Sequence, residues 1–241
     1  MLYLIGLGLD IGGISKEGLE ILKRCKKVYL ENYTVDFPYS FEELQHEMDK
    51  KITPLSREAV ENLGFLDEAV KADVALLVYG NPLTATTHIS ILDEAKKSEI
   101  KIRVIYGASI LDAVAETGLQ LYKFGKITSM PRWDENKNFA PESFVEIVKE
   151  NQSINAHTLI LIDIGLDFQE ALKQLEISAE EKKIKLRKII VCQSLGTRNR
   201  KILYRTIEEL REFDGVKKPY CVIIPGKLHF MESDFLRNFE G

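Results

Sequence analysis

The stretch Val74-Ala75-Leu76-Leu77-Val78-Tyr79, which runs directly into Gly80-Asn81-Pro82, decides the fold class of this chain. An unbroken run of apolar and aromatic residues suits a strand that is covered on both faces, as central strands of parallel sheets are. The Gly-Asn-Pro that follows ends the strand in a sharp turn. Parallel strands need crossover connections, so helices are expected on either side. The sequence therefore predicts an α/β protein with a mostly parallel sheet.

Apolar runs and amphipathic helical patterns alternate along the rest of the chain, as expected for helices packed on a sheet. Further strands are predicted at residues 2–7, 28–31, 102–106, 158–164, 188–192 and 220–224. Helices are predicted over residues 15–25, with Ser15 as the cap, from Ser56 onward, after Thr87 and after Ser109. The helix from Ser56 is expected to bury Ala59, Val60, Leu63, Leu66 and Val70 on one face.

The pattern changes beyond Gly107, where the second half brings its own strands and helices. A polar loop is expected at residues 131–141, because prolines and asparagines there discourage regular structure. The charged run 180–188 is expected to be a solvated helix end or an edge strand leading into a core strand. A chain of 241 residues with 45% hydrophobic residues can form two compact domains. We expect α/β domains at residues 1–107 and 108–241.

Composition bears on location and partners. A net charge of −4 and a pI near 5.7 provide no overall attraction to nucleic acid or to anionic membranes. The apolar stretches are too short to span a bilayer. Cys25, Cys192 and Cys221 are widely spaced and lie in or beside apolar stretches, which favours buried thiols in a reducing compartment. We expect a cytoplasmic protein with no nucleic-acid or membrane partner.

The first predicted strand runs into a glycine-rich turn that contains Gly6 and Gly8. A dinucleotide-binding fingerprint would place its third glycine at Ile11, so the turn lacks that motif. A nucleoside ligand without phosphates suits the turn, but a plain strand-to-helix connection has the same pattern. Glu31 ends the second strand, where it either accepts hydrogen bonds from ribose hydroxyls or caps the strand end.

The turn at residues 80–88, Gly-Asn-Pro-Leu-Thr-Ala-Thr-Thr-His, crowds polar side chains at the start of a helix. Helix capping accounts for only one or two of the set Asn81, Thr84, Thr86 and Thr87. Open α/β sheets bind ligands at the carboxyl ends of their strands, so this turn is predicted to bind a ligand. His88 is either a packed or capping residue or a base.

No metal chemistry or hydrolase nucleophile is indicated. The four histidines, His46, His88, His157 and His229, are scattered, and no HExxH motif or Cys/His cluster occurs. No GxSxG elbow is present either. We expect a metal-free reaction that depends mainly on positioning, and the residues themselves identify no catalytic group.

Several segments together resemble the diphthine synthase family, within the tetrapyrrole-methylase superfamily. They are residues 3–9 (YLIGLGL), 55–58 (LSRE), 80–88 (GNPLTATTH), 109–110 (SI), 122–126 (YKFGK), 157–159 (HTL), 163–164 (DI) and 224–229 (IPGKLH). The resemblance extends over nearly the whole chain, and the ATTH and PGKLH segments are specific to this family within its superfamily.

The resemblance implies two α/β domains of the tetrapyrrole-methylase (class III methyltransferase) type. It further implies S-adenosylmethionine as the cofactor, bound in the cleft between the domains, and a homodimer. The family's cofactor-contacting positions fall here on Leu9, Asn81, Thr84, Ser109, Ile110, Ile162, Leu195 and Tyr220.

Two of these positions depart from the family's pattern. Where the resemblance leads us to expect an aspartate and a small apolar residue, the chain has Asn81 and Thr84. An asparagine keeps an acceptor oxygen but loses the charge, so attraction to the cationic groups of the cofactor should weaken. Around Leu195 the match to the family is one of shape more than of letters.

The implied reaction is methyl transfer to the amino group of the 3-amino-3-carboxypropyl histidine of translation elongation factor 2, which gives diphthine in diphthamide biosynthesis. Attack on a sulfonium methyl needs an uncharged amine, collinear approach and exclusion of water. Asp163 either receives protons near the cleft or caps a strand end. Five cations either attract the substrate or are simply solvated: Lys123, Lys126, Arg132, Arg198 and Arg200.

Three alternatives stay open from the sequence. The first is a methyltransferase of the same fold that acts on a corrin or other tetrapyrrole ring or on ribosomal RNA. The ATTH and PGKLH segments disfavour this alternative. A regulatory module would bind S-adenosylmethionine or a nucleotide without turnover, an interpretation that Asn81 keeps open. A nicotinamide-dependent oxidoreductase is disfavoured by Ile11.

Overall fold

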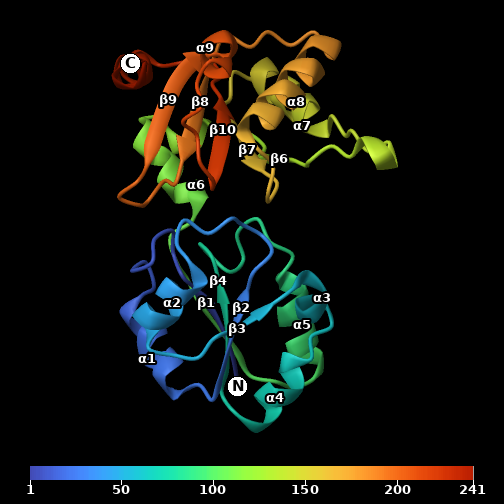
Figure 1. Ribbon diagram of the computed structural model, residues 1–241, viewed down its shortest axis with the longest axis vertical. Coiled ribbons are helices and arrows are strands. Elements are labelled where there is room, and N and C mark those ends of the chain that lie inside the picture. The colour runs from blue at the N-terminus through green and yellow to red at the C-terminus, as the bar shows by residue number, and fades with distance from the viewer. Residues whose placement is uncertain (241) are drawn as a thin grey trace. The chain divides into compact units, whose positions relative to one another are not determined.

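The computed structural model describes residues 1–240, which form two compact units that divide between Ile110 and Leu111 (Figure 1). This division lies three residues beyond the boundary expected after residue 107. Each unit contains one five-stranded sheet.

The sheet of the first unit is entirely parallel, with the strand order β3-β2-β4-β1-β5. Its strands are β1 (Leu2–Gly6), β2 (Lys27–Glu31), β3 (Thr53–Leu55), β4 (Val74–Val78) and β5 (Ile102–Ile105). The predicted central strand is confirmed: Leu76 of β4 belongs to the core on one face, and Leu77 to the core on the other. β3 was not predicted, because two of its three residues are exposed.

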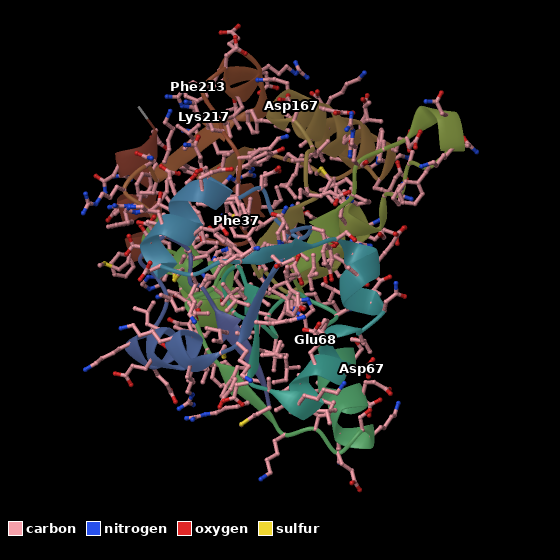
Figure 2. The ribbon with its side chains drawn as sticks, turned by 60° about the horizontal axis from the view of Figure 1, so that its bottom comes forward. Phe37, Asp67, Glu68, Asp167, Phe213 and Lys217 are labelled. Carbon is pink, nitrogen blue, oxygen red and sulfur yellow. The ribbon has the colours of Figure 1, made fainter. Side chains whose placement is uncertain are left out.

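Helices cover both faces of this sheet (Figure 1). One face carries α1 (Lys16–Arg24) and α2 (Phe41–Met48), and the other carries α3 (Arg57–Glu61), α4 (Phe65–Lys71) and α5 (Ile89–Lys97). Ser15 caps α1 as predicted, since its Oγ accepts a hydrogen bond from Gly18 N at 3.0 Å. Glu68, labelled in Figure 2, joins α4 to β2 by accepting from Lys27 Nζ and Tyr29 Oη, each at 2.5 Å.

The prediction of one continuous helix from Ser56 is wrong in its length. Ser56 does cap α3, but the chain breaks at Leu63, whose φ of +57° is incompatible with a right-handed helix, and α4 begins at Phe65. The break rotates the second helix, so Val70 is 67% exposed instead of facing the core. Helical spacing alone did not reveal this break.

The second sheet has the order β6-β7-β10-β8-β9. Its strands are β6 (Thr128–Met130), β7 (Thr158–Ile162), β8 (Lys188–Gln193), β9 (Lys201–Thr206) and β10 (Tyr220–Ile224). Only β6 and β7 pair in parallel, so the expectation of a mostly parallel sheet is wrong for this unit. A short connection without a helix joins β8 to β9, and such a connection makes neighbouring strands antiparallel.

The helices of this half are α6 (Ile110–Ala113), α7 (Ser143–Ser153), α8 (Phe168–Glu181), α9 (Ile207–Arg211) and α10 (Phe230–Leu236). Short 3₁₀ turns are η1 (Val114–Thr117), η2 (Leu121–Lys123), η3 (Glu135–Lys137) and η4 (Arg237–Phe239). Phe144 of α7 and Leu172 of α8 pack into one core with the sheet. The charged run 180–188 ends α8 and leads into β8, which confirms its helix-end interpretation. The helix predicted after Ser109 is a single α-helical turn that continues as η1.

The three cysteines are free and buried, as expected. Burial raises the pKa of Cys25 to about 11, so this thiol stays protonated and packs as a small apolar side chain. Within residues 1–240, none of the helices is both long and apolar enough to cross a membrane.

Candidate functional site

The carboxyl ends of β1, β4 and β5 are drawn together by close backbone packing. Gly8 and Gly80 exchange backbone hydrogen bonds of 3.2 and 2.9 Å, and both have a φ of +69°. A Cβ atom on Gly107 would lie 2.6 Å from Gly80 O and 2.8 Å from Gly8 N. A Cβ on Gly6 would be as close to the same backbone, 2.6 Å from Gly80 O. Residues without a side chain are therefore required at this junction.

Asn81 ties two of these turns together. Its Oδ1 accepts a hydrogen bond from Leu83 N at 3.1 Å, and its Nδ2 donates one to Gly107 O at 3.3 Å. One partner is a donor and the other an acceptor, so an amide satisfies both, whereas a carboxylate would set an anionic oxygen against the Gly107 carbonyl. The family resemblance implies that Asn81 contacts the cofactor. The structure adds a role in holding the β4 and β5 turns together.

The turn after β1 is held in place by the aromatic side chain of Tyr79, which Phe37 supports. Tyr79 Oη donates a hydrogen bond to the carbonyl of Leu9 at 2.9 Å. Phe37, labelled in Figure 2, packs edge-on against Tyr79 with 5.3 Å between ring centroids. Burial raises the pKa of Tyr79, which keeps its hydroxyl protonated as a donor. The backbone of Leu9 is thus held at the edge of the sheet.

The other positions predicted in this unit belong to the same edge. Thr84 N donates to Asn81 O at 3.2 Å, which closes the turn after β4. Ser109 is buried, its Cα lies 3.9 Å from where a Cβ of Gly80 would be, and Ile110 follows it. The structure therefore brings together the predicted residues Leu9, Asn81, Thr84, Ser109 and Ile110. None of the five is charged, which fits a nucleoside ligand without phosphates.

The remaining predicted positions meet at one edge of the second sheet. Tyr220 of β10 pairs with Gln193 of β8. On the other side, β10 runs antiparallel to β7 and its Cys221 pairs with Leu161, so Ile162 lies opposite Tyr220. Leu195 follows β8 by two residues and is buried. Tyr220 turns its ring toward the core, where its hydroxyl donates to Leu166 O at 3.1 Å, so only its backbone is available to a ligand at this edge.

Two residues of the first unit, Glu31 and His88, had open interpretations and have structural roles. Glu31 is 1% exposed, and its carboxylate accepts from Tyr33 N at 2.8 Å and from Thr34 Oγ1 at 2.6 Å. It is thus a strand-end cap. His88 is buried with its Nδ1 3.0 Å from Pro82 O, which supports the packed alternative over a base.

Asp163 also acts as a cap, because its two oxygens accept hydrogen bonds from Arg132 N at 3.1 Å and Ile164 N at 3.0 Å.

Most of the cations that were expected near a substrate have acidic partners within the chain. These pairs are Lys126–Glu150, Arg132–Glu170, Arg200–Glu116 and Lys123–Glu232. Arg198 is exposed.

A buried carboxylate, Glu232, was missed by sequence reasoning. It is 0% exposed and accepts from Gln120 N at 2.9 Å, His229 N at 2.7 Å and His157 Nε2 at 3.0 Å. Lys123 Nζ completes the set with a short ion pair. The segments YKFGK, HTL and PGKLH therefore converge on one side chain. The only sequence indication was the position of Glu232 in a capping box at the start of α10.

His157 is held in one tautomer by this network. Gly226 N donates to His157 Nδ1 at 2.9 Å, so the ring proton is on Nε2, where it is donated to Glu232. Burial lowers the pKa of His157, and the neighbouring carboxylate offsets this only in part. Burial also raises the pKa of Glu232, but hydrogen bonds from Lys123, the backbone and His157 outweigh it and lower that pKa to about 2.

We predict that Glu232→Ala lowers the free energy of unfolding by about 3 kcal/mol or more, because it leaves Lys123 and buried N–H groups without their acceptor. Urea unfolding followed by circular dichroism measures the change. The matched control is Glu150→Ala, which breaks the exposed pair with Lys126 and should cost less than about 1 kcal/mol. Equal losses in the two variants would contradict the central role of Glu232.

A pH effect should follow from His157. Its folded-state pKa is below the ordinary value of 6.5, so the unfolded chain takes up a proton that the folded chain does not. The free energy of unfolding should therefore fall as pH decreases below about 6.5. Glu232 contributes only at lower pH, between its ordinary pKa of 4.5 and about 2.

The variant His157→Gln removes this titration while its amide still donates to Glu232. Urea unfolding at pH 7 and at pH 5.5 should therefore show a smaller loss of stability for the variant than for the unmodified protein. The same loss in both proteins would show that His157 is not the group that titrates.

Groups of three or more His, Cys, Asp or Glu side chains able to hold a metal ion do not occur among residues 1–240. The model of the family described as Tetrapyrrole (Corrin/Porphyrin) Methylases matches residues 1–211. This match spans most of the chain and includes Ile162 and Leu195 of the second sheet edge, whereas Tyr220 lies beyond it.

Individual relatives match the chain almost from end to end. A diphthine synthase of Methanocaldococcus jannaschii is 38% identical, with 98% of both chains covered. A diphthine methyl ester synthase of Schizosaccharomyces pombe is 34% identical, covering 99% of this chain and 94% of its own. A crystal structure of a diphthine synthase superposes with a TM-score of 0.90 at 33% identity, covering 99% of this chain and 95% of the other. The chain therefore belongs to the tetrapyrrole methylase family and, within it, to the diphthine synthases, which makes it a methyltransferase.

Proposed function

We propose that the protein uses S-adenosylmethionine to methylate the amino group of the 3-amino-3-carboxypropyl histidine of elongation factor 2, which yields diphthine in diphthamide biosynthesis. The proposal rests on the full-length match to diphthine synthases, together with five uncharged side chains near the ends of β1, β4 and β5. We further propose that the protein acts as a homodimer in the cytoplasm.

We propose that the cofactor is contacted by Leu9, Asn81, Thr84, Ser109 and Ile110 of the first unit. S-adenosylmethionine is a nucleoside without phosphates, and the packed glycine backbones with the uncharged Asn81 and Thr84 side chains suit it. Contacts from Ile162, Leu195 and Tyr220 are predicted from the family resemblance, with Tyr220 acting through its backbone.

When bound, the cofactor supplies a methyl group activated on a sulfonium sulfur. The contribution of the chain is to position that group rigidly, because a displacement of the order of 1 Å can cost about 100-fold in rate. The two hydrogen bonds of Asn81 and the bond from Tyr79 to Leu9 hold the turns in place before any ligand binds. We assign no catalytic base, since both oxygens of Asp163 accept backbone hydrogen bonds.

A methyl ester is a second candidate product, and the names of two relatives support it. The Schizosaccharomyces pombe relative is a diphthine methyl ester synthase, whereas the Methanocaldococcus jannaschii relative is a diphthine synthase. The two relatives are similarly distant, at 34% and 38% identity. The substrate carboxylate is therefore a candidate acceptor after the amine.

We predict that Gly107→Ala weakens binding of S-adenosylhomocysteine by about tenfold or more, because its Cβ would press on the backbone of both Gly80 and Gly8. Isothermal titration calorimetry measures the affinity, and a thermal melt checks the fold. The control is Gly12→Ala, in the turn after β1, where an added Cβ meets nothing within 4 Å and affinity should stay within about twofold. Unchanged binding in Gly107→Ala would exclude the junction as the cofactor site.

The proposed activity is tested by incubating the protein with S-adenosylmethionine and elongation factor 2 that carries the 3-amino-3-carboxypropyl histidine. Intact mass spectrometry should show stepwise gains of methyl groups at that histidine. Mild alkali separates the two products, because a methyl ester is hydrolysed and an N-methyl group is retained.

No mass gain despite measurable cofactor binding would overturn the assignment. Parallel incubations with a corrin and with ribosomal RNA would then identify an acceptor of the same fold class. Binding without transfer to any of the three would favour a regulatory module.

A further inference from the structure

One loop of the second unit rises from the sheet edge that carries the proposed cofactor positions. Residues 131–141, here called the projecting loop, follow β6 directly. β6 and β7 are parallel and Met130 pairs with Ile162, so both strands end at the same edge. The backbones meet there, because Asp163 N donates to Met130 O at 3.1 Å and Arg132 N donates to Asp163 Oδ2 at 3.1 Å. The projecting loop therefore begins beside Ile162.

The projecting loop is longer than the connection between β6 and α7 requires. Loops that join a strand to a helix typically take about two to six residues, whereas here α7 starts only at Ser143. In Figure 1 the loop is the yellow-green segment that extends outward beyond β6, and it contains η3. Compact surface loops that are held by their own side chains are frequently functional. The extra length indicates a task other than joining the two elements.

A buried side chain holds the base of the projecting loop. Gln174 of α8 is 2% exposed, its Nε2 donates to Pro131 O at 3.0 Å, and its Oε1 accepts from Trp133 N at 3.2 Å. Trp133 Nε1 donates to Pro141 O at 3.3 Å and thereby joins the two ends of the loop. Burying an amide is costly unless its polar atoms are paired, and both pairs are made with the loop backbone. Gln174 thus fixes the direction in which the loop leaves the sheet.

The tip of the projecting loop is closed by its own hydrogen bonds. Asp134 N donates to Phe139 O at 2.9 Å, and Phe139 N donates to Asp134 O at 3.0 Å. The Asp134 carboxylate accepts from Asn136 N at 3.1 Å and pairs with Lys137 Nζ at 3.1 Å. These bonds order the tip before a partner binds, which reduces the entropic cost of binding. The Phe139 side chain is nevertheless 49% exposed, so an ordered tip presents an aromatic ring to the surroundings.

The charges and the apolar area of the loop select the class of partner. Lys137 is paired with Asp134, and Arg132 Nε lies 3.8 Å from Glu170 Oε2, so the loop offers no block of positive charge to nucleic acid or anionic lipid. The exposed half of the Phe139 side chain amounts to roughly 100 Å². Each partner in a stable dimer buries about 800 Å². A contact as small as this one fits a protein that binds transiently and leaves after each turnover.

The acceptor of the proposed reaction adds a geometric constraint. Its amine stands at the end of one modified side chain, which remains attached to a folded protein. The surface of that protein must therefore come within the length of one side chain from the transferred methyl group. A segment that rises from the proposed cofactor edge stands where that surface arrives. A small acceptor needs no such contact, whereas a protein acceptor gains affinity from it.

We propose that the projecting loop docks the protein that carries the acceptor histidine, with Phe139 as its main contact. The ring packs on the partner's surface around the modified side chain, while Gln174 and Trp133 hold the loop in position. The loop adds affinity for the acceptor and takes no part in cofactor binding or methyl transfer. This inference rests on the proposed function, because that function supplies the protein acceptor, elongation factor 2.

Steady-state methyl transfer with elongation factor 2 as the varied substrate, at saturating S-adenosylmethionine, tests the docking role. Phe139→Ala should raise KM for the factor by roughly tenfold and leave kcat within about twofold, because the lost contact is the same before and during transfer. The matched control is Val70→Ala, which truncates an apolar side chain that is 67% exposed. Val70 lies near the end of α4, which leads to the amino end of β4 and away from the ligand edge, so KM should not change.

Three measurements accompany both variants. Titration with S-adenosylhomocysteine should give the same dissociation constant as for the unmodified protein, and sedimentation velocity should give the same oligomeric state. The fluorescence emission of Trp133, the only tryptophan of the chain, reports on the base of the loop. It should not shift in Phe139→Ala, because the bonds that close the tip are made by backbone atoms.

An unchanged KM for Phe139→Ala, with normal transfer by the unmodified protein, would overturn the docking proposal and leave the proposed function intact. No transfer by the unmodified protein would overturn both. Weaker binding of S-adenosylhomocysteine, or a fall in kcat alone, would assign the loop to the transfer site instead. Altered sedimentation would assign it to a contact between two copies of the chain. A shifted Trp133 emission would make Phe139 a residue that holds the loop and not one that contacts the acceptor.

Discussion

The candidate cofactor edge depends on the close approach of three backbone segments, at Gly6, Gly80 and Gly107. Carbonyl and amide groups from β1, β4 and β5 come so near to one another that a single added Cβ would lie 2.6 to 2.8 Å from main-chain atoms. Parallel strands end at the same edge of a sheet, but pleated strands do not by themselves bring their turns into contact. The absence of side chains at Gly6 and Gly107 allows that contact, and Asn81 then fixes two of the turns together with its amide.

The second unit is organised around a polar group instead. Glu232 is fully buried, and the energetic cost of burying its charge is offset by Lys123, His157 and two backbone N–H groups. The same hydrogen bonds hold η2 against α10. The YKFGK segment supplies Lys123 and the PGKLH segment supplies the backbone N–H of His229, and both contact the buried carboxylate of Glu232.

Local patterns in the sequence identified the elements that obey simple periodicities. β4 was evident because every residue is apolar, and α1 because Ser15 precedes an amphipathic helix. β9 was missed because its lysine, tyrosine and arginine residues suit a half-exposed strand whose partner is known only in three dimensions. The helix from Ser56 was predicted too long, because helical spacing continues through Leu63 although its backbone conformation does not.

The sequence by itself determined the α/β class, a mostly parallel sheet in the first half, the glycine turn and the polar turn at Asn81, since each shows in the local pattern of residues. It also indicated the family. Only the tertiary structure decided the largely antiparallel pairing of the second sheet, the capping roles of Glu31 and Asp163, and the donor role of Asn81 toward Gly107. It likewise decided that Lys123 and His157 meet at Glu232, 109 and 75 residues away along the chain. The contacts of Asn81 with Gly107, of Asp163 with Arg132 and of Glu232 with its partners join residues far apart in sequence. Glu31 bonds to near neighbours, but a buried carboxylate has the same letter as an exposed one.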